Sequence, residues 1–159
     1  MRFLERPDVL DPAGGTDIFQ MPPGRLRFDA GTEALRCVHL SAKVLRWYTD
    51  CCRTPVGNTA ASARFPIAAV IHAFMDHQAH GRSRDDALGP ALCRIYERSA
   101  KGPLPSTTPP PPSLRIFGKR ASLMLRWWMR GLTRPSPFFD ERTGAPLHPP
   151  TSCCPPSTS

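Results

Sequence analysis

Residues 45–59 read LRWYTDCCRTPVGNT, in which an apolar, aromatic run ends in two adjacent cysteines and is followed by Thr-Pro-x-Gly-Asn. Aromatic and β-branched residues are typical of strands, whereas Pro, Gly and Asn are typical of turns. The stretch therefore predicts a strand over Lys43–Tyr48 and a turn over Thr54–Asn58. Cys51 and Cys52 would lie at the mouth of that turn, where a metal ion or a redox partner can reach both thiols.

The residues before this stretch alternate short strand-like runs with turns that contain Gly or Pro. Strands are expected over Asp17–Met21, Leu26–Phe28 and Ala34–Leu40. Closely spaced short strands separated by such turns indicate an antiparallel sheet. The fold class predicted here is therefore mainly β within an α+β protein, with a small antiparallel core.

The residues after the cysteine pair are less regular. Phe65–Met75 is rich in Ile, Val and Phe and predicts a buried strand, although its alanines leave a helix open. Ser83 is followed three residues later by Asp86, a capping-box pattern that predicts a short helical turn. Gly89 should end that turn, and Ala91–Arg98 is ambiguous between strand and helix.

A second, separate helix is predicted over residues 114–132, with Ser113 as its N-cap. Helical spacing gives it an apolar stripe of Phe117, Ala121, Met124, Trp128 and Leu132. The opposite stripe is polar and mostly basic, formed by Arg115, Lys119, Ser122, Arg126 and Arg130. Two roles stay open for the apolar stripe, which are packing against the core and contact with a membrane or partner.

Proline divides the chain into five parts. Of the 20 prolines in the sequence, 13 follow residue 100, and proline cannot join the interior of a sheet or helix. We expect an irregular N-terminus over 1–13, a β core over 14–100, a proline-rich linker over 101–113, the helix, and an irregular or disordered tail over 133–159.

The net charge of +8 is concentrated in the second half of the chain. Residues 1–91 contain 11 Lys and Arg against 10 Asp and Glu, and residues 92–159 contain 10 against 3. A basic segment favours an anionic neighbour such as a membrane surface or an acidic protein partner, although it can also serve solubility alone. The chain carries no nucleic-acid-binding motif, so no specific nucleic-acid partner is predicted.

The six cysteines are expected to be reduced. The first residues contain no apolar segment of the kind that a signal peptide needs, and the longest apolar run is too short to span a bilayer. A cytoplasmic protein is therefore expected, and cytoplasmic thiols are free or metal-bound more often than disulfide-bonded.

Cys51 and Cys52 are the candidate metal ligands, with zinc as the expected ion. A structural zinc site needs four ligands, and this pair is a single cysteine knuckle at most. Three histidines, His72, His77 and His80, could add nitrogen ligands, but their spacing matches no common site. Satisfied surface histidines are the alternative interpretation, and no catalytic residue is assigned.

Several segments together resemble a bacterial domain-of-unknown-function family, number 6151. The resemblance covers residues 3–145 and is most specific at two blocks, Gly14–Gln20 and Cys51–Thr59. The other matching segments are Phe3-Leu4, Val9–Asp11, Leu26–Phe28, Leu45–Tyr48, His72 with Met75–His77, Gly81–Asp85, Ser136–Asp140 and Thr143-Gly144.

That family is in turn distantly similar to the superfamily of glutathione-dependent formaldehyde-activating enzyme and centromere protein V. The resemblance implies a small β-tent fold, zinc held by cysteines, and carbon–sulfur lyase-like chemistry on a small thiol adduct. Cys52 would match the second cysteine of the last zinc-binding pair and Thr49 the first, with Cys51 as a substitute. The earlier zinc cysteines have no counterpart, so the resemblance implies an N-terminally truncated chain with an incomplete ligand set.

Three functional hypotheses follow from these observations. The first is a carbon–sulfur lyase-like enzyme, or a remnant of one that has lost its zinc cysteines. The alternative is a peripheral binding module that uses the basic amphipathic helix over residues 114–132. The third is a fragment without function.

Overall fold

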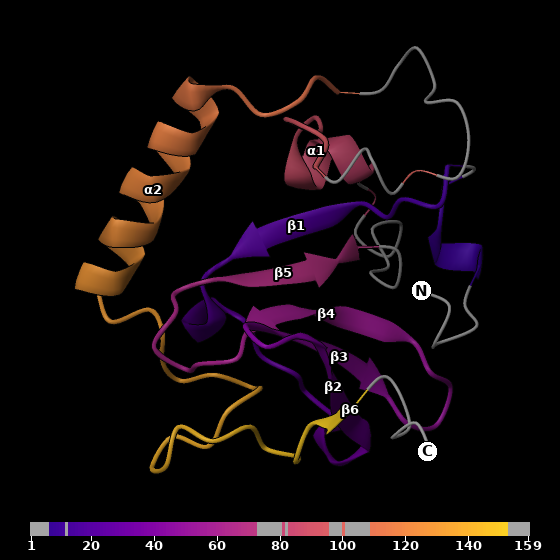
Figure 1. Ribbon diagram of the computed structural model, residues 1–159, viewed down its shortest axis with the longest axis vertical. Helices are drawn as coiled ribbons and strands as arrows, with labels where there is room; N and C mark the ends of the chain where they lie inside the picture. The colour runs from indigo at the N-terminus through magenta and orange to yellow at the C-terminus, as the bar shows by residue number, and fades with distance from the viewer. Residues whose placement is uncertain are drawn as a thin grey trace, which may run out of the picture.

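The computed structural model describes residues 7–11, 13–72, 81, 83–95, 100 and 109–152. Its centre is a sheet of six strands in the order β1-β5-β4-β3-β2-β6 (Figure 1). The strands are β1 (Ile18–Met21), β2 (Leu35–Ser41), β3 (Val44–Thr49), β4 (Pro55–Ala60), β5 (Ala68–Ile71) and β6 (Thr151–Ser152). All neighbours pair antiparallel except β2 and the short β6, which run parallel. The prediction of an α+β, mainly β fold with a small antiparallel core is confirmed.

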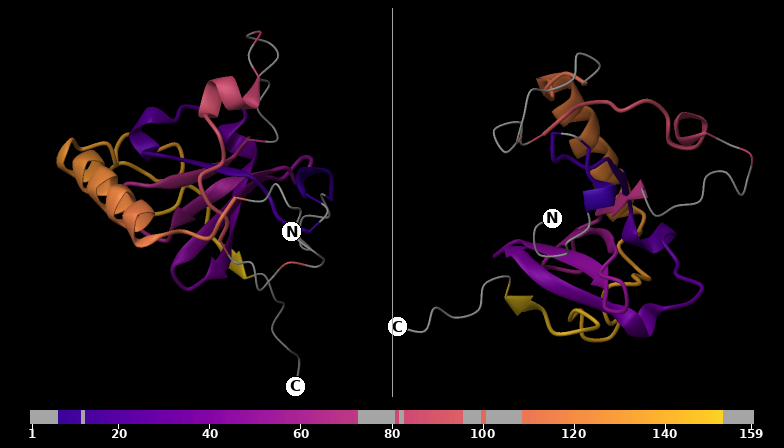
Figure 2. Two further views of the ribbon diagram at one scale, coloured as in Figure 1. Left: turned by 90° about the horizontal axis from the view of Figure 1, so that it is seen from above. Right: turned by 90° about the vertical axis from the view of Figure 1, so that its right-hand side faces the viewer.

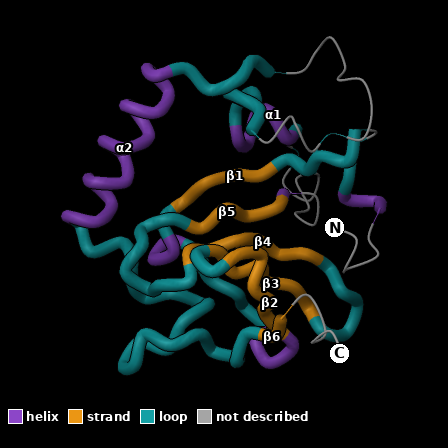
Figure 3. Tube along the Cα trace, in the orientation of Figure 1, coloured by secondary structure: helices purple, strands orange, loops and turns teal. Residues whose placement is uncertain are grey.

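The helical elements lie outside the sheet. They are the 3-10 turns η2 (Pro7–Val9), η3 (Pro23–Arg25) and η4 (Thr32–Ala34), the short helix α1 (Arg84–Leu88) and the longer helix α2 (Leu114–Met129). Figure 2 shows that α2 stands to one side of the sheet rather than on one of its faces. A long loop then leads from α2 to β6 (Figure 3).

The core is built from alternate residues of β2 and β3 and from residues of β4, β5 and the loop after α2. The buried cluster is Leu35, Cys37, Leu45, Trp47, Val56, Ala68, Val70, Phe138 and Phe139. Trp47 is completely buried, and its indole Nε1–H donates to Thr59 Oγ1 at 2.9 Å. The ring centroids of Trp47 and Phe138 are 5.0 Å apart, within the range of favourable aromatic contact.

The turn predicted over Thr54–Asn58 is wrong, because Pro55–Asn58 lie in strand β4. Pro55 is tolerated as the first residue of the strand, where its missing backbone N–H disrupts the hydrogen bonds between strands least. Gly57 allows β4 to approach β5 closely, since a Cβ built on Gly57 would lie 2.7 Å from the Ala69 carbonyl oxygen. Gly57 therefore serves strand packing rather than a turn.

The strand predicted over Leu26–Phe28 is also wrong, because these residues form an irregular segment after η3. The Leu26 N–H donates back to the Pro23 carbonyl at 3.0 Å and so closes the 3-10 turn. Leu26 and Phe28 still pack half-buried against the core cluster. The alternating pattern therefore predicts the burial of Leu26 and Phe28 correctly, but these residues are not part of the sheet.

The strand predicted over Phe65–Met75 is shorter in the structure. Strand β5 covers Ala68–Ile71, and residues 73–80 lie outside the described part of the chain. Both predicted N-caps are confirmed, since Ser83 and Asp86 form a complete capping box on α1 and Ser113 Oγ accepts from the Ile116 N–H on α2. Helix α2 ends at Met129, three residues before the predicted end.

The segment after α2 contributes more to the fold than its proline content indicates. Phe138 is 0% exposed and Phe139 is 4% exposed, so both belong to the core. Thr151 and Ser152, expected in a disordered tail, pair with β2 as strand β6. Of the predicted linker over 101–113, residues 101–108 lie outside the described part, as do residues 153–159 of the tail.

Candidate functional site

Cys51 and Cys52 lie within the turn that joins β3 to β4, and not at its mouth. The turn is closed by the Thr49 N–H, which donates to the Thr54 carbonyl oxygen at 3.0 Å. Arg53 adopts the left-handed conformation with φ of 53°, which curls the backbone after the two cysteines. The turn is also tied to the preceding segment, because the Asp50 N–H donates to the Ala34 carbonyl oxygen at 2.8 Å.

This turn brings the two sulfur atoms together. The Sγ atoms of Cys51 and Cys52 are 3.6 Å apart, with the Cys51 thiol donating to Cys52. Adjacent side chains on an extended strand point to opposite sides, so a curled backbone is required for this contact. Both cysteines are exposed. A small molecule can therefore reach either sulfur from solvent.

Two threonine hydroxyls contact the second sulfur. Cys52 Sγ lies 3.1 Å from Thr49 Oγ1 and 3.1 Å from Thr54 Oγ1. The Thr54 N–H donates to Thr49 Oγ1 at 3.2 Å, which occupies the oxygen as an acceptor. The hydroxyl proton of Thr49 is then available for Cys52 Sγ, since its other acceptor, the Thr54 carbonyl oxygen, is more distant at 3.5 Å.

These contacts lower the pKa of the Cys52 thiol to about 6. The largest cause is the hydrogen bond from the Thr49 hydroxyl, followed by the Thr54 hydroxyl, the Thr54 backbone N–H and the Cys51 thiol. Each of these donors stabilises the charged form of the sulfur, which favours ionisation. The lowered pKa favours the thiolate of Cys52, and the thiolate is the nucleophilic form of cysteine.

The spacing of the two sulfur atoms can be compared with that of two zinc ligands. Two thiolates on one tetrahedral zinc ion are about 3.8 Å apart, given Zn–S bonds of about 2.3 Å, and the observed separation of 3.6 Å is close to this value. Within the described residues, however, no group of three Cys, His, Asp or Glu side chains gathers in one place. The described part of the chain does not fit a complete four-ligand zinc site.

The other predicted ligands do not join the pair within the described residues. His72 Nε2 lies 3.1 Å from Asp17 Oδ2, so this histidine has a carboxylate partner of its own. His77 and His80 fall outside the described residues, as do the tail cysteines. Cys37 is buried in the core and Cys93 is half-buried, so neither resembles the exposed pair.

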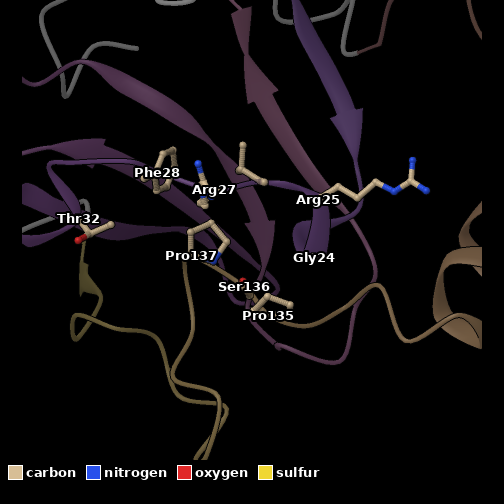
Figure 4. Close-up of a pocket in the computed structure, with 9 residues that line it drawn as sticks. Gly24, Arg25, Arg27, Phe28, Thr32, Pro135, Ser136 and Pro137 are labelled. Carbon is tan, nitrogen blue, oxygen red and sulfur yellow. The ribbon is translucent and has the colours of Figure 1, made fainter.

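A second candidate is an open hollow of about 560 Å³ between residues 24–32 and residues 135–137 (Figure 4). Its wall combines backbone and apolar side chains such as Phe28, Pro135 and Pro137. Arg25 points away from the other lining side chains in Figure 4. Arg27 is occupied by an ion pair with Asp29 at 2.7 Å. Thr32 and Ser136 supply the hydroxyls of the hollow, and its lining residues include no Cys, His, Asp or Glu.

Sequence reasoning selected the cysteine pair but missed the two threonines as a unit. The hairpin places Thr49 and Thr54 at its two ends, so they meet across the turn although five positions separate them. The signal in the sequence is a Thr on each side of the two cysteines, at a spacing that a short hairpin turn brings together. Thr49 was noted only as the counterpart of a missing cysteine.

Comparison with known proteins gives one match. The model of the family described as "Family of unknown function (DUF6151)" matches residues 3–148, which is most of the chain. No curated protein and no solved structure matches. The resemblance to family 6151 is thereby confirmed, and the more distant similarity to the zinc superfamily stays a prediction.

Proposed function

The chain belongs to the DUF6151 family, and we propose that its Cys51–Cys52 turn is a nucleophilic thiol site that exchanges with small disulfides. Cys52 is the attacking group, and Thr49 and Thr54 position and stabilise its sulfur. The observation that carries the proposal is the contact of one exposed sulfur with two hydroxyls, each at 3.1 Å. Hydrogen bonds to an anion are stronger than those between neutral groups, so the pair of hydroxyls favours the thiolate.

The exchange needs no external oxidant. The Cys52 thiolate attacks one sulfur of a disulfide RS–SR, a new S–S bond forms, and the other sulfur leaves as RS⁻ with the electron pair of the broken bond. A free thiolate R′S⁻ then attacks the bound RS sulfur, which gives RS–SR′ and returns the Cys52 thiolate. Each of the two steps breaks one S–S bond and forms one, so atoms and electrons balance.

The surroundings of Cys52 support both steps. Exposure of the sulfur allows the approach of a disulfide along the S–S axis, which a buried thiol could not provide. A thiol of low pKa is also a good leaving group, which favours the return step. Cys51 contributes a donor 3.6 Å away that stabilises the same charge.

Carbon–sulfur lyase activity on a thiol adduct is not part of this proposal. That chemistry is implied by the resemblance to zinc enzymes. A tetrahedral zinc ion needs four ligands, and the described residues bring together only the two thiols of Cys51 and Cys52. Zinc and the small thiol adduct stay predictions from the sequence. Elemental analysis of the purified chain tests them, and zinc near one equivalent would support them.

The proposal is tested with an aromatic disulfide that releases a coloured thiolate, mixed with the full chain near pH 7. We expect rapid release and, by mass spectrometry of peptides, a mixed disulfide at Cys52. The matched variants are Cys52→Ser and Cys51→Ser, which change one sulfur each in the same turn. Cys52→Ser should remove the fast phase, and Cys51→Ser should change its rate by less than about tenfold, since the serine hydroxyl still offers a donor at that position. First modification at Cys51, or an unchanged fast phase in Cys52→Ser, would refute the proposal.

A further inference from the structure

Helix α2 carries an apolar face that the rest of the described chain does not cover. We call it the outer apolar face, and its exposed residues are Leu114, Phe117, Ala121, Leu125, Trp128 and Met129. The exposed fractions are large for such side chains, at 89% for Leu114, 59% for Trp128 and 64% for Met129. Contiguous apolar surface of this kind marks an interaction site more often than chance exposure.

The predicted apolar stripe of α2 is only partly covered, since Met124 and Leu132 are half-buried. Phe117, Ala121 and Trp128 from that stripe are exposed. Besides Met124, the half-buried apolar residues of the helix are Ile116, Leu123 and Trp127, and no residue of α2 is fully buried.

Positive charge borders the outer apolar face. The helix and its C-cap contain Arg115, Lys119, Arg120, Arg126 and Arg130, and they contain no Asp or Glu. By helical spacing Arg115, Lys119, Arg126 and Arg130 follow one flank of the face, whereas Arg120 is half-buried on the opposite side of the helix. The aliphatic stems of such residues can lie along an apolar layer while the charged heads reach its polar surface.

We propose that α2 docks on a membrane surface that carries anionic lipids, with its outer apolar face in the headgroup region. A row of exposed cations along one flank of an apolar face matches negatively charged headgroups above acyl chains. Within the described residues no helix is both long and apolar enough to cross a membrane, so α2 would lie in the plane of the surface. The convex single-helix face forms no groove for a peptide.

The segment just after the helix is hydrogen-bonded to the turn η3, which follows strand β1. The Gly24 N–H donates to the Leu132 carbonyl oxygen at 2.8 Å, just after the helix. A Cβ on Gly24 would lie 2.6 Å from the Arg134 carbonyl oxygen, so the two segments pack closely there. Docking of α2 would therefore tether the sheet to the membrane through this contact.

The test is co-sedimentation of the full chain with vesicles at low ionic strength. One set contains phosphatidylcholine and phosphatidylserine at about 2:1, and the other contains phosphatidylcholine alone. We expect binding to the anionic vesicles that weakens as salt is added. Tryptophan emission should shift to shorter wavelength on binding, and the shift reports on α2 because Trp47 is already fully buried.

Two pairs of variants separate the apolar and the charged contributions. Trp128→Asp should weaken binding at least about tenfold, while Leu92→Asp, a matched control at another exposed apolar residue, should not. The double variant Lys119→Glu, Arg126→Glu should weaken binding by about fivefold or more for each cation removed. The double variant Arg64→Glu, Arg142→Glu changes the charge by the same amount away from α2 and serves as its control. Circular dichroism of each variant checks that the fold is retained.

Three outcomes would overturn the proposal. The first is a wild-type chain that stays in the supernatant with anionic vesicles. The second is equal binding by Trp128→Asp and Leu92→Asp. The third is equal binding by the Lys119→Glu, Arg126→Glu variant and the Arg64→Glu, Arg142→Glu control. The first of these would favour an acidic protein partner for the same face. The readouts do not involve Cys52, so failure here leaves the thiol proposal unaffected.

Discussion

Cys37 and Cys52 are the same residue type in opposite environments. Cys37 lies on strand β2 inside the core, is 1% exposed, and donates its S–H to the His148 carbonyl oxygen at 3.3 Å. Burial raises the pKa of the Cys37 thiol to about 11. Cys52 is exposed in a turn with four donors around it, and the pKa of its thiol is about 6. The fold itself therefore decides which thiol can react.

The largest expected effect is the difference in alkylation between these two thiols. With iodoacetamide near pH 7, Cys52 should be modified more than about 1,000-fold faster than Cys37, because only Cys52 is both ionised and accessible. Mass spectrometry of peptides measures both rates in one sample. Addition of denaturant should remove the difference, and a Cys37 that reacts as fast as Cys52 in the folded chain would break the comparison.

A smaller effect is expected from removal of one hydroxyl. Thr54→Val keeps the shape of the side chain but removes a donor from Cys52 Sγ. The pKa of Cys52 should rise, so the alkylation rate at pH 6 should fall by about three- to tenfold and recover at high pH.

Thr32→Val is the matched control for this change, since Thr32 is an exposed threonine in η4 outside the thiol turn. The control should react as the wild type does. Equal rates in Thr54→Val and the wild type at pH 6 would show that the hydroxyl does not support the thiolate.

The smallest effect concerns stability. Cys37→Ala leaves a small cavity in the core and should lower the free energy of unfolding by about 1–2 kcal/mol. Cys51→Ala changes an exposed turn and should change it by less than about 0.5 kcal/mol. Urea titration followed by circular dichroism measures both values. A larger loss for Cys51→Ala than for Cys37→Ala would contradict the assignment of one thiol to structure and the other to chemistry.

Part of this fold could be predicted from sequence because it depends on local pattern. Three local patterns predict the structure of their own segments. They are the alternation of Leu35 and Cys37, the aromatic run that contains Trp47, and the Ser83 cap. Strand β4 was missed because Pro and Gly there serve strand start and close packing with β5, which only the tertiary structure reveals. Likewise, the burial of Phe138 depends on a return of the chain from beyond α2.

The candidate site was also predicted only in part. The pattern identified Cys51 and Cys52, because two adjacent cysteines are visible without a structure. Their contact at 3.6 Å depends on the left-handed conformation of Arg53, and the support of Cys52 depends on a hairpin that joins Thr49 to Thr54. These are consequences of backbone geometry, for which residue types alone give weak signals.

The measurement that tests the central claim most directly is the pH dependence of Cys52 alkylation, resolved by peptide mass spectrometry. The thiolate is the reactive form, so a lowered pKa moves the rise in rate to lower pH. The account predicts a midpoint at the pKa of about 6 and a nearly constant rate above neutral pH. A midpoint near the ordinary cysteine pKa of about 8.5, with a rate still rising above neutral pH, would contradict it.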